Sequence, residues 1–309
     1  MIRKDQLPNI WGDGFGGDSD VYRTITANGG SNKIVLHDTN GWNLLHINDH
    51  NGYDPQEDDC DNIHLLLGEN AEMELYRLQV MERTRVTNME ITMQAGARLR
   101  LCTLTLGGDH VRNNIVVRMK GEGCQLEAYG LYLVDREQEC DNYIFVEHAH
   151  PHCTSYELYK GIVDDAARAR FNGHVLVQDG AVKTEAYMTN RNIILTDKAH
   201  VDTRPFLEIY NDDVKCSHGS TIGQLDEQAL FYLRSRGIPE RTAMTMLSYA
   251  FCDEVVSCIT IDSLRDTIGD MVKKRLHGEL MPPCDECAIP CTSPCNGTEA
   301  NFHIDPAKL

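Results

Sequence analysis

The residues best placed to do chemistry are a thiol and an imidazole two positions apart, Cys216 and His218. On an extended strand, residues two apart point to the same face. Sulfur together with imidazole nitrogen suits iron or zinc. The spacing is equally compatible with a half-buried cysteine and a surface histidine at the end of a strand. Cys216 and His218 are therefore candidate metal ligands whose use depends on what lies beside them.

A second group of candidate ligands is the alternating set His148, His150 and His152. If the strand continued through them, the three rings would align on one face. Pro151 argues against a central, fully hydrogen-bonded strand at this point. The pattern predicts either an exposed polar edge or a small metal site.

Four cysteines close to the end of the chain form a third group, with one CxxC step followed by two CxxxC steps. Four thiolates so close together can hold zinc or an iron–sulfur cluster. The alternative is a reduced tail that binds nothing in particular. This group supports the hypothesis of a metal or cluster carrier, with the ligands Cys284, Cys287, Cys291 and Cys295.

Two pairs of adjacent aspartates, Asp164-Asp165 and Asp212-Asp213, could be the carboxylates of a β-helix carbohydrate-active enzyme. Adjacent aspartates are more typical of turns. The sequence contains no GxSxG or HExxH motif and no P-loop. An enzymatic function therefore has little support from motifs.

Composition excludes several classes of protein. The net charge is −18, without a basic cluster, so nucleic acid is not expected as a partner. No run of eighteen apolar residues predicts a membrane span, and the first residues lack the apolar stretch of a signal peptide. We therefore expect a cytoplasmic protein whose 12 cysteines are mostly reduced thiols.

The elements that must position these residues change along the chain. Residues 1–60 are rich in Gly, Asn and Asp, which predicts an irregular segment with short strands. Residues 61–222 repeat a template of a turn, a small residue and period-two alternation. The small residue recurs at positions 71, 97, 124 and 181. Repetition at this scale favours a mainly β fold with a stacked β-helix core. A β-sandwich or barrel is the alternative.

Residues 223–280 change to a helical pattern and predict a small C-terminal α-helical domain. A first helix stops at Gly237, and Pro239 suits the first turn of the next. In that second helix a face is predicted along Ala243, Leu247, Ala250, Phe251, Val255 and Ile259. Residues 281–309 form a tail rich in Cys and Pro with no periodicity.

Several separated blocks give the sequence a specific resemblance. It resembles the core domain of the SufB/SufD family of SUF iron–sulfur cluster assembly scaffolds, most closely SufD. The match is close over about half the chain and looser over residues 60–141. The blocks are Pro151-His-Cys-Thr-Ser155, Lys160-Gly-Ile162, Phe171-Asn-Gly173, Thr189-Asn-Arg-Asn-Ile-Ile-Leu-Thr196, Leu207-Glu-Ile-Tyr-Asn-Asp-Asp-Val-Lys-Cys-Ser-His-Gly219 and Leu230-Phe-Tyr-Leu-Arg-Ser-Arg-Gly-Ile238.

The resemblance implies a right-handed β-helix followed by a helical domain, and a non-catalytic role. It implies pairing with a SufB-like subunit, or a homodimer, and docking of a SufC-like ATPase that hydrolyses the ATP. His218 matches the interface histidine implicated in building a transient cluster shared with the partner, and Cys216 is a plausible second ligand. The ATPase dock would lie on the helices and include Leu230, Phe231, Tyr232, Arg234, Arg236 and Phe251.

The sequence departs from the family pattern at three places. Asn190 stands where SufB carries its interface cysteine, so a partner is expected to supply that ligand. Residues 1–60 do not resemble the N-terminal helical region of most SufD proteins. The cysteine-rich tail is an addition that the family pattern does not include.

Overall fold

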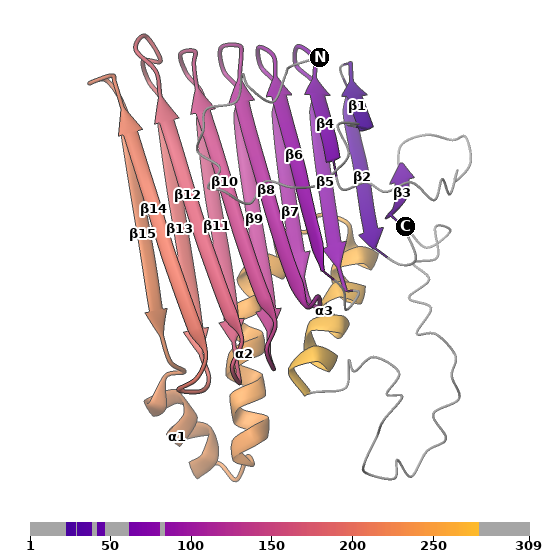
Figure 1. Ribbon diagram of the computed structural model, residues 1–309, viewed down its shortest axis with the longest axis vertical. Helices are drawn as coiled ribbons and strands as arrows, with labels where there is room; N and C mark the ends of the chain where they lie inside the picture. Colours follow the sequence, from indigo (N-terminus) through magenta and orange to yellow (C-terminus); the bar gives the residue numbers. More distant parts are fainter. Residues whose placement is uncertain (1–22, 29, 39–41, 47–61, 81–83, 278–309) are drawn as a thin grey trace.

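The computed structural model describes residues 23–28, 30–38, 42–46, 62–80 and 84–277. Within them the chain forms two facing sheets followed by three helices (Figure 1). Neighbouring strands run parallel except where β2 pairs with β3. The predicted cysteine-rich tail lies outside the described residues.

The two sheets are defined by their strand order. Sheet A contains β1 (Arg23–Ala27), β4 (Asn62–Leu67), β6 (Arg85–Met93), β8 (His110–Met119), β10 (Glu139–His148), β12 (Arg168–Val177) and β14 (His200–Ile209). Sheet B contains β15 (Lys215–Gly223), β13 (Glu185–Ile194), β11 (Thr154–Val163), β9 (Gln125–Val134), β7 (Arg98–Thr105), β5 (Glu72–Gln79), β2 (Ser31–Asp38) and β3 (Trp42–His46).

From β4 onward each successive strand joins the opposite sheet, so the chain winds as a β-solenoid. One coil contributes one strand to each sheet, and coils stack in register through parallel hydrogen bonding, as between β9 and β11. This confirms the predicted β-helix core with helices after it. Strands β1 and β2 extend the same pairing to residues before position 61.

The small residue of the sequence template marks a corner of the solenoid. Ala71, Ala97 and Cys124 each directly precede a strand of sheet B, and all three are fully buried. In the next two coils the equivalent positions are Cys153 and Thr184, which are also buried. The backbone N–H of Glu185 donates to the Cys153 carbonyl, and the backbone N–H of Lys215 donates to the Thr184 carbonyl in the same way. Ala181 lies three residues earlier because this turn is longer. A small side chain is needed where the backbone bends between the sheets.

The interior between the sheets is packed by interlocking side chains from adjacent coils. A methyl group placed on Gly130 would collide with the ring of Tyr159, its register partner in the next coil. A methyl group on Gly161 would collide with the ring of Tyr132 in the preceding coil. Each aromatic ring therefore occupies the space left by a glycine in its neighbour.

We expect Gly130→Ala to lower the free energy of unfolding by about 1–3 kcal/mol, because the added carbon overpacks the space filled by Tyr159. Urea denaturation followed by circular dichroism measures this change. Gly219→Ala is the matched control, since a carbon added there meets nothing within 4 Å. Equal stabilities for the two variants would contradict the interlocking described above.

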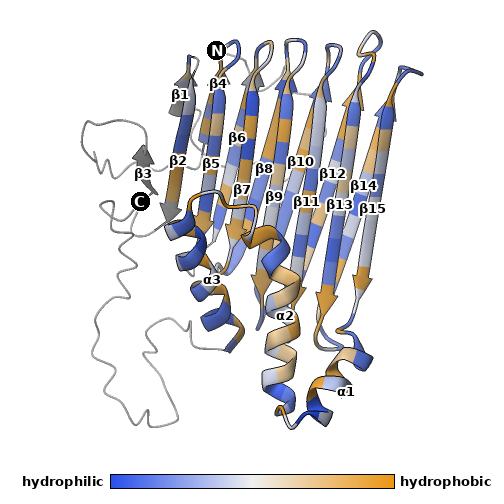
Figure 2. Ribbon diagram, turned by 180° about the vertical axis from the view of Figure 1, so that it is seen from behind, coloured by the Kyte–Doolittle hydropathy of each residue, from blue (hydrophilic) through white to orange (hydrophobic). Residues whose placement is uncertain are grey.

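Three helices follow the solenoid, namely α1 (Glu227–Ser235), α2 (Glu240–Val256) and α3 (Asp262–His277). Helices α2 and α3 cover part of the outer face of sheet B (Figure 2). We call residues 227–277 the helical module. Figures 1 and 2 show α2 and α3 lying at the end where the strands of sheet B finish. A second apolar core fills this seam, separate from the interior of the solenoid. Its members include Leu78, Leu104, Leu131, Ile162, Val255 and Ile268.

The first helix ends at the predicted signal, whereas Pro239 precedes the first turn of α2 as its N-cap. Asp226 caps α1 by accepting hydrogen bonds from the backbone of Gln228 and Ala229. Gly237 has φ of +85°, which ends the first helix as expected. The predicted face of α2 is partly wrong, because Ala250 is exposed whereas Cys252 is buried. Among the described residues no helix combines the length and apolar character needed to cross a membrane.

Candidate functional site

The solenoid ends in an uncovered coil. We call β14 and β15 the terminal coil. Each is the last strand of its sheet, and within the described residues neither has a strand paired on its outer side. Every side chain of β15 is exposed apart from the half-buried Cys216. An unpaired strand edge with free backbone donors and acceptors is a ready surface for pairing with another chain.

The two ligand candidates of the sequence lie on this coil. Cys216 aligns with Ala186, and His218 aligns with Met188, and both of these neighbours face the interior. Cys216 packs against the edge of the interior core, whereas His218 is exposed. Burial raises the pKa of Cys216 above its ordinary value, although a backbone hydrogen bond at Ala186 partly opposes this. The structure therefore places a thiol and an imidazole together on the open end of the solenoid.

Large apolar side chains are exposed at other positions of the terminal coil. Phe206 is 55% exposed and Tyr210 is 58% exposed, at the sheet A side of the terminal coil. Ile222 is 46% exposed on β15. A group of exposed apolar residues around a strand edge is typical of a protein–protein interface. These residues could not be singled out from the sequence, because no local pattern distinguishes them from core residues.

A buried polar network supports the strand that pairs with β15. Asn190 donates to the Tyr132 hydroxyl at 3.0 Å and to the Tyr159 carbonyl at 3.2 Å. Asn192 donates to the side chain of Asn190 at 2.7 Å. Both asparagines are buried. Asn190, the position compared with the SufB cysteine, is thus engaged in holding adjacent coils together.

The predicted ATPase-docking residues fall into two groups. Helix α1 has no buried residue. Its Phe231 is 74% exposed and its Tyr232 is 56% exposed. Arg234 near the end of the helix and the capping residue Arg236 are exposed as well. Leu230 is half-buried. Phe251 on α2 is also half-buried and packs against the second core, with Lys160 lying 4.3 Å from its ring centre. Phe251 therefore contacts the solenoid, whereas α1 presents its aromatic rings outward.

Buried polar contacts fix the helical module to the solenoid. The Lys160 ammonium, on β11, donates to the Phe251 carbonyl at 2.8 Å and pairs with Glu254. At the other side of the seam, Arg275 on α3 donates to the Leu106 carbonyl at 3.0 Å and pairs with Asp135. These contacts hold the two parts in one orientation, so displacement of the helices would act on the strands.

Acid is expected to weaken the contact at Asp135. Burial alone would raise the pKa of Asp135. The hydrogen bond and the charge of Arg275 outweigh burial and hold this pKa below its ordinary value. The stabilisation is therefore present above pH about 4 and lost as pH falls through the lowered pKa. We expect Asp135→Asn to lower the free energy of unfolding by about 1–2 kcal/mol at pH 7 and less at pH 3. Denaturation at both pH values tests this, and an equal loss at both would contradict it.

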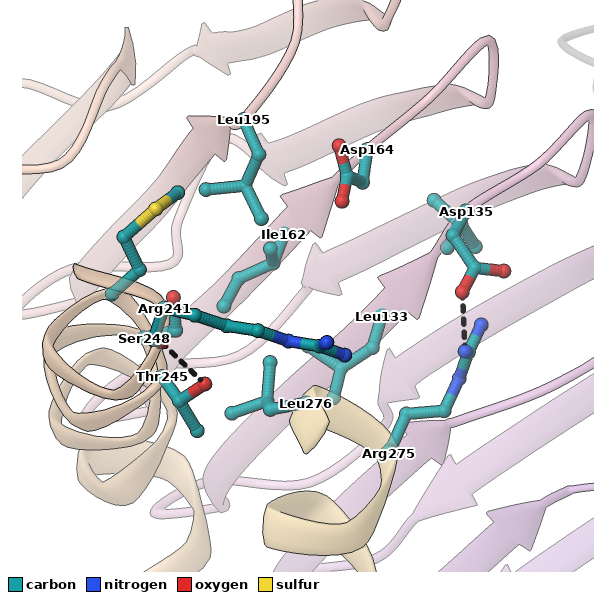
Figure 3. A pocket seen from close by; sticks show the side chains of 12 residues that line it. Leu133, Asp135, Ile162, Asp164, Leu195, Arg241, Thr245, Ser248, Arg275 and Leu276 are labelled. Carbon is teal, nitrogen blue, oxygen red and sulfur yellow. Dashed lines mark hydrogen bonds and ion pairs between the residues drawn. The ribbon is translucent and has the colours of Figure 1, made fainter. Parts of the chain in front are cut away.

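One cavity of about 260 Å³ lies along the seam between sheet B, α2 and α3 (Figure 3). Its walls are mostly apolar, and Arg241 extends across it in Figure 3. The two carboxylates that line it are already engaged: Asp135 binds Arg275, and Asp164 accepts the backbone N–H of Asp165. The cavity is thus part of the seam and offers no free acid–base pair.

Two motif interpretations are changed by the structure. The alignment of the three histidines on one strand face is wrong, because β10 ends at His148. His148 is buried in the interior, whereas His150 and His152 are exposed in the turn that follows. The paired aspartates have turn and ion-pair roles: Asp165 accepts from the backbone of Arg136, and Asp213 pairs with Lys183 at 2.8 Å.

The described residues contain no group of three or more His, Cys, Asp or Glu arranged to hold a metal ion. The pair Cys216 and His218 falls short of the four ligands that iron–sulfur clusters generally use. The four tail cysteines, Cys284, Cys287, Cys291 and Cys295, lie outside the described residues.

Comparison with known proteins agrees with this architecture. The family model for the SUF system FeS cluster assembly SufBD core domain matches residues 28–251. The iron–sulfur cluster assembly protein SufD of Escherichia coli is 41% identical over 173 residues, which are 56% of this chain and 41% of that protein. A SufBD family protein of Synechocystis is 36% identical over 213 residues, 68% of this chain and 47% of that protein.

A SufBD family protein of Mycobacterium bovis is 39% identical over 189 residues, 59% of this chain and 48% of that protein. The chain thus spans about half the length of the curated relatives it matches. The family model covers the coils from β2 onward, α1 and most of α2. It therefore includes the terminal coil with Cys216 and His218. This chain therefore belongs to the SufBD family of SUF iron–sulfur cluster assembly proteins and is SufD-like.

Proposed function

We propose that this chain is a scaffold subunit that pairs with a SufB-like subunit through its terminal coil and docks a SufC-like ATPase through its helical module. The iron–sulfur cluster is the cargo, built transiently between the two scaffold subunits. The observation that carries the proposal is the end of the solenoid, where within the described residues no strand pairs beyond β15, the strand that carries Cys216, His218 and the exposed Ile222.

Pairing at the terminal coil follows from the chemistry of an open sheet edge. A second solenoid could add its own last strand to β15 and cover Ile222. His218 would then lie within the interface, with the partner providing the remaining ligands. A homodimer would supply the same ligands from both sides, whereas a SufB-like subunit would supply different ones.

Co-purification of the full chain with a SufB-like subunit tests the pairing. We expect Ile222→Asp to lower the recovered partner at least tenfold, because a carboxylate would be buried unpaired in the interface. Tyr156→Ser is the matched control, since Tyr156 is 40% exposed on β11, a central strand of sheet B. Normal partner recovery with Ile222→Asp would refute pairing at this edge.

Docking of the ATPase is proposed on α1 because its aromatic residues Phe231 and Tyr232 are exposed and no other described residue buries them. Phe231→Ala should reduce capture of a SufC-like ATPase without affecting capture of the SufB-like subunit. Met246→Ala, an exposed position on α2, serves as the control. Loss of both partners in the Phe231 variant would indicate a folding defect, which circular dichroism would detect.

The proposed role is non-catalytic, and ATP hydrolysis belongs to the docked ATPase. The cytoplasmic location expected from the sequence remains a prediction. A carrier function of the four tail cysteines is the second hypothesis, with zinc or an iron–sulfur cluster as the bound species. Replacing Cys284, Cys287, Cys291 and Cys295 together should leave cluster assembly by the complex nearly unchanged if the scaffold role is correct.

A further inference from the structure

Two buried cysteines lie side by side in adjacent coils, away from the terminal coil. Cys124 directly precedes β9 and Cys153 directly precedes β11, at the corner position that Ala71 and Ala97 occupy in earlier coils. The backbone N–H of Thr154 donates to the Cys124 carbonyl at 2.8 Å, so the parallel ladder continues to these residues. Neighbouring parallel strands lie about 4.8 Å apart, within the range of Cα separations that a disulfide spans.

The two sulfur atoms converge on one backbone oxygen. Cys124 Sγ lies 3.2 Å from the Gly121 carbonyl oxygen, and Cys153 Sγ lies 3.3 Å from the same atom. Both thiols are reduced and fully buried. A thiol pair held this closely needs little movement of the backbone to form a sulfur–sulfur bond.

A histidine lies beside the pair. His148, the last residue of β10, is fully buried; its Nε2 lies 2.9 Å from the Ser155 hydroxyl, whereas its Nδ1 has no hydrogen-bond partner among the described residues. The neighbouring Cys124 thiol, and to a lesser degree the His148 ring, hold the pKa of Cys153 below its ordinary value despite burial. The same contact raises the pKa of Cys124.

We propose that Cys124 and Cys153 form a redox-active dithiol whose oxidising substrate is a small hydroperoxide. The Cys153 thiolate attacks the terminal peroxide oxygen, the O–O bond breaks, and Cys153 becomes a sulfenic acid while hydroxide or alkoxide leaves and takes up a proton. The Cys124 sulfur then attacks Cys153, an S–S bond forms, and water leaves. The two thiols are oxidised by two electrons, and the peroxide is reduced to water or an alcohol. This site goes beyond the proposed scaffold function.

Short turns cover the pair, so a small neutral oxidant needs only a local opening. The turn over Cys124 contains Gly123, whose φ is +73°, and an added Cβ there would meet nothing within 4 Å. The turn over Cys153 contains the exposed His152, whose φ of +59° is unusual for a residue other than glycine.

Two other buried thiols differ from Cys153. Burial raises the pKa of Cys140 and of Cys252 to about 12.

The experiment treats the full chain with hydrogen peroxide and maps its cysteines by peptide mass spectrometry. The wild-type protein should yield a peptide linked between Cys124 and Cys153 before Cys140 or Cys252 is modified. In Cys124→Ala, Cys153 should stop at the sulfenic acid and be captured by a dione probe at least tenfold faster than Cys140. Both cysteines can be replaced by alanine safely, because alanine fills the same corner position at Ala71 and Ala97.

Cys153→Ala should leave Cys124 unreactive, since Cys153 is the attacking thiol. Absence of the linked peptide in the wild-type protein would overturn the proposal. So would capture of Cys153 in Cys124→Ala at the rate of Cys140, because both cysteines would then be only small buried side chains at a corner. Circular dichroism of each variant confirms that the coils are intact before oxidation is measured.

Discussion

Replacing His218 with alanine is expected to lower cluster formation by the assembled scaffold at least tenfold, without loss of folding or of partner binding. The ring is exposed at the end of the solenoid, so its removal leaves no cavity in the core. In the proposed scaffold role, the variant would lose a nitrogen ligand on the same strand as the half-buried thiol of Cys216. Reconstitution with iron and sulfide, followed by the visible absorbance of the cluster, measures the effect.

His200→Ala is the matched control for this experiment. His200 is also exposed on the terminal coil, but it lies at the start of β14, whereas His218 lies on β15. Cys216→Ser should give an intermediate loss if the thiol is a second ligand. Equal cluster content in the His218 and His200 variants would show that the imidazole on β15 is not used.

The second large effect concerns a carboxyl group inside the solenoid. Glu157 is fully buried, its register partners are Ala128 and Met188, and neither carboxyl oxygen has a hydrogen-bond partner among the described residues. Burial raises its pKa to about 8. The folded chain therefore keeps a proton that the unfolded chain releases above pH about 4.3. Stability falls as pH rises from that value through the raised pKa.

We expect Glu157→Gln to remove this fall, because an amide cannot ionise. Relative to the wild-type protein, the variant should gain on the order of a few kcal/mol in the free energy of unfolding between pH 5 and pH 8. Denaturant unfolding of both proteins at the two pH values measures this gain. Because the gain is a difference between two pH values, any pH-independent cost of burying the amide cancels. Glu137→Gln, at an exposed turn position, is the control. Parallel pH profiles for Glu157→Gln and the wild-type protein would rule out a buried neutral carboxyl group.

The solenoid was predictable because its signal repeats. The small residues at 71, 97 and 124 are fully buried corner residues, and the alternation after them marks inward and outward side chains. The helix end at Gly237 was also predictable, since the left-handed backbone there depends on local chemistry. The buried face of α2 was less predictable, because Cys252 and Ser248 are buried by the tilt of the helix on sheet B, which no local pattern records.

The site was only partly predictable. Spacing alone indicated that Cys216 and His218 share a strand face. Their position on the last coil could not be predicted, because no local pattern shows which strand ends the sheet. Ile222 is an apolar residue of the kind found in cores, and it is exposed because no strand among the described residues pairs beyond β15. Phe206 lies on the outer face of sheet A against the ring of His174. The contact between Lys160 and Phe251 joins positions 91 residues apart, so its partners could not be inferred from sequence spacing.

The interlocking of Gly130 with Tyr159 and of Gly161 with Tyr132 makes each coil specific to its neighbours. Repeat proteins commonly change length by duplicating or deleting whole units. In this chain an inserted copy of one coil would bring a tyrosine against a tyrosine, or leave two glycines facing an empty space. Changes in length are therefore expected at the ends of the stack, and the middle coils should be inherited as one block.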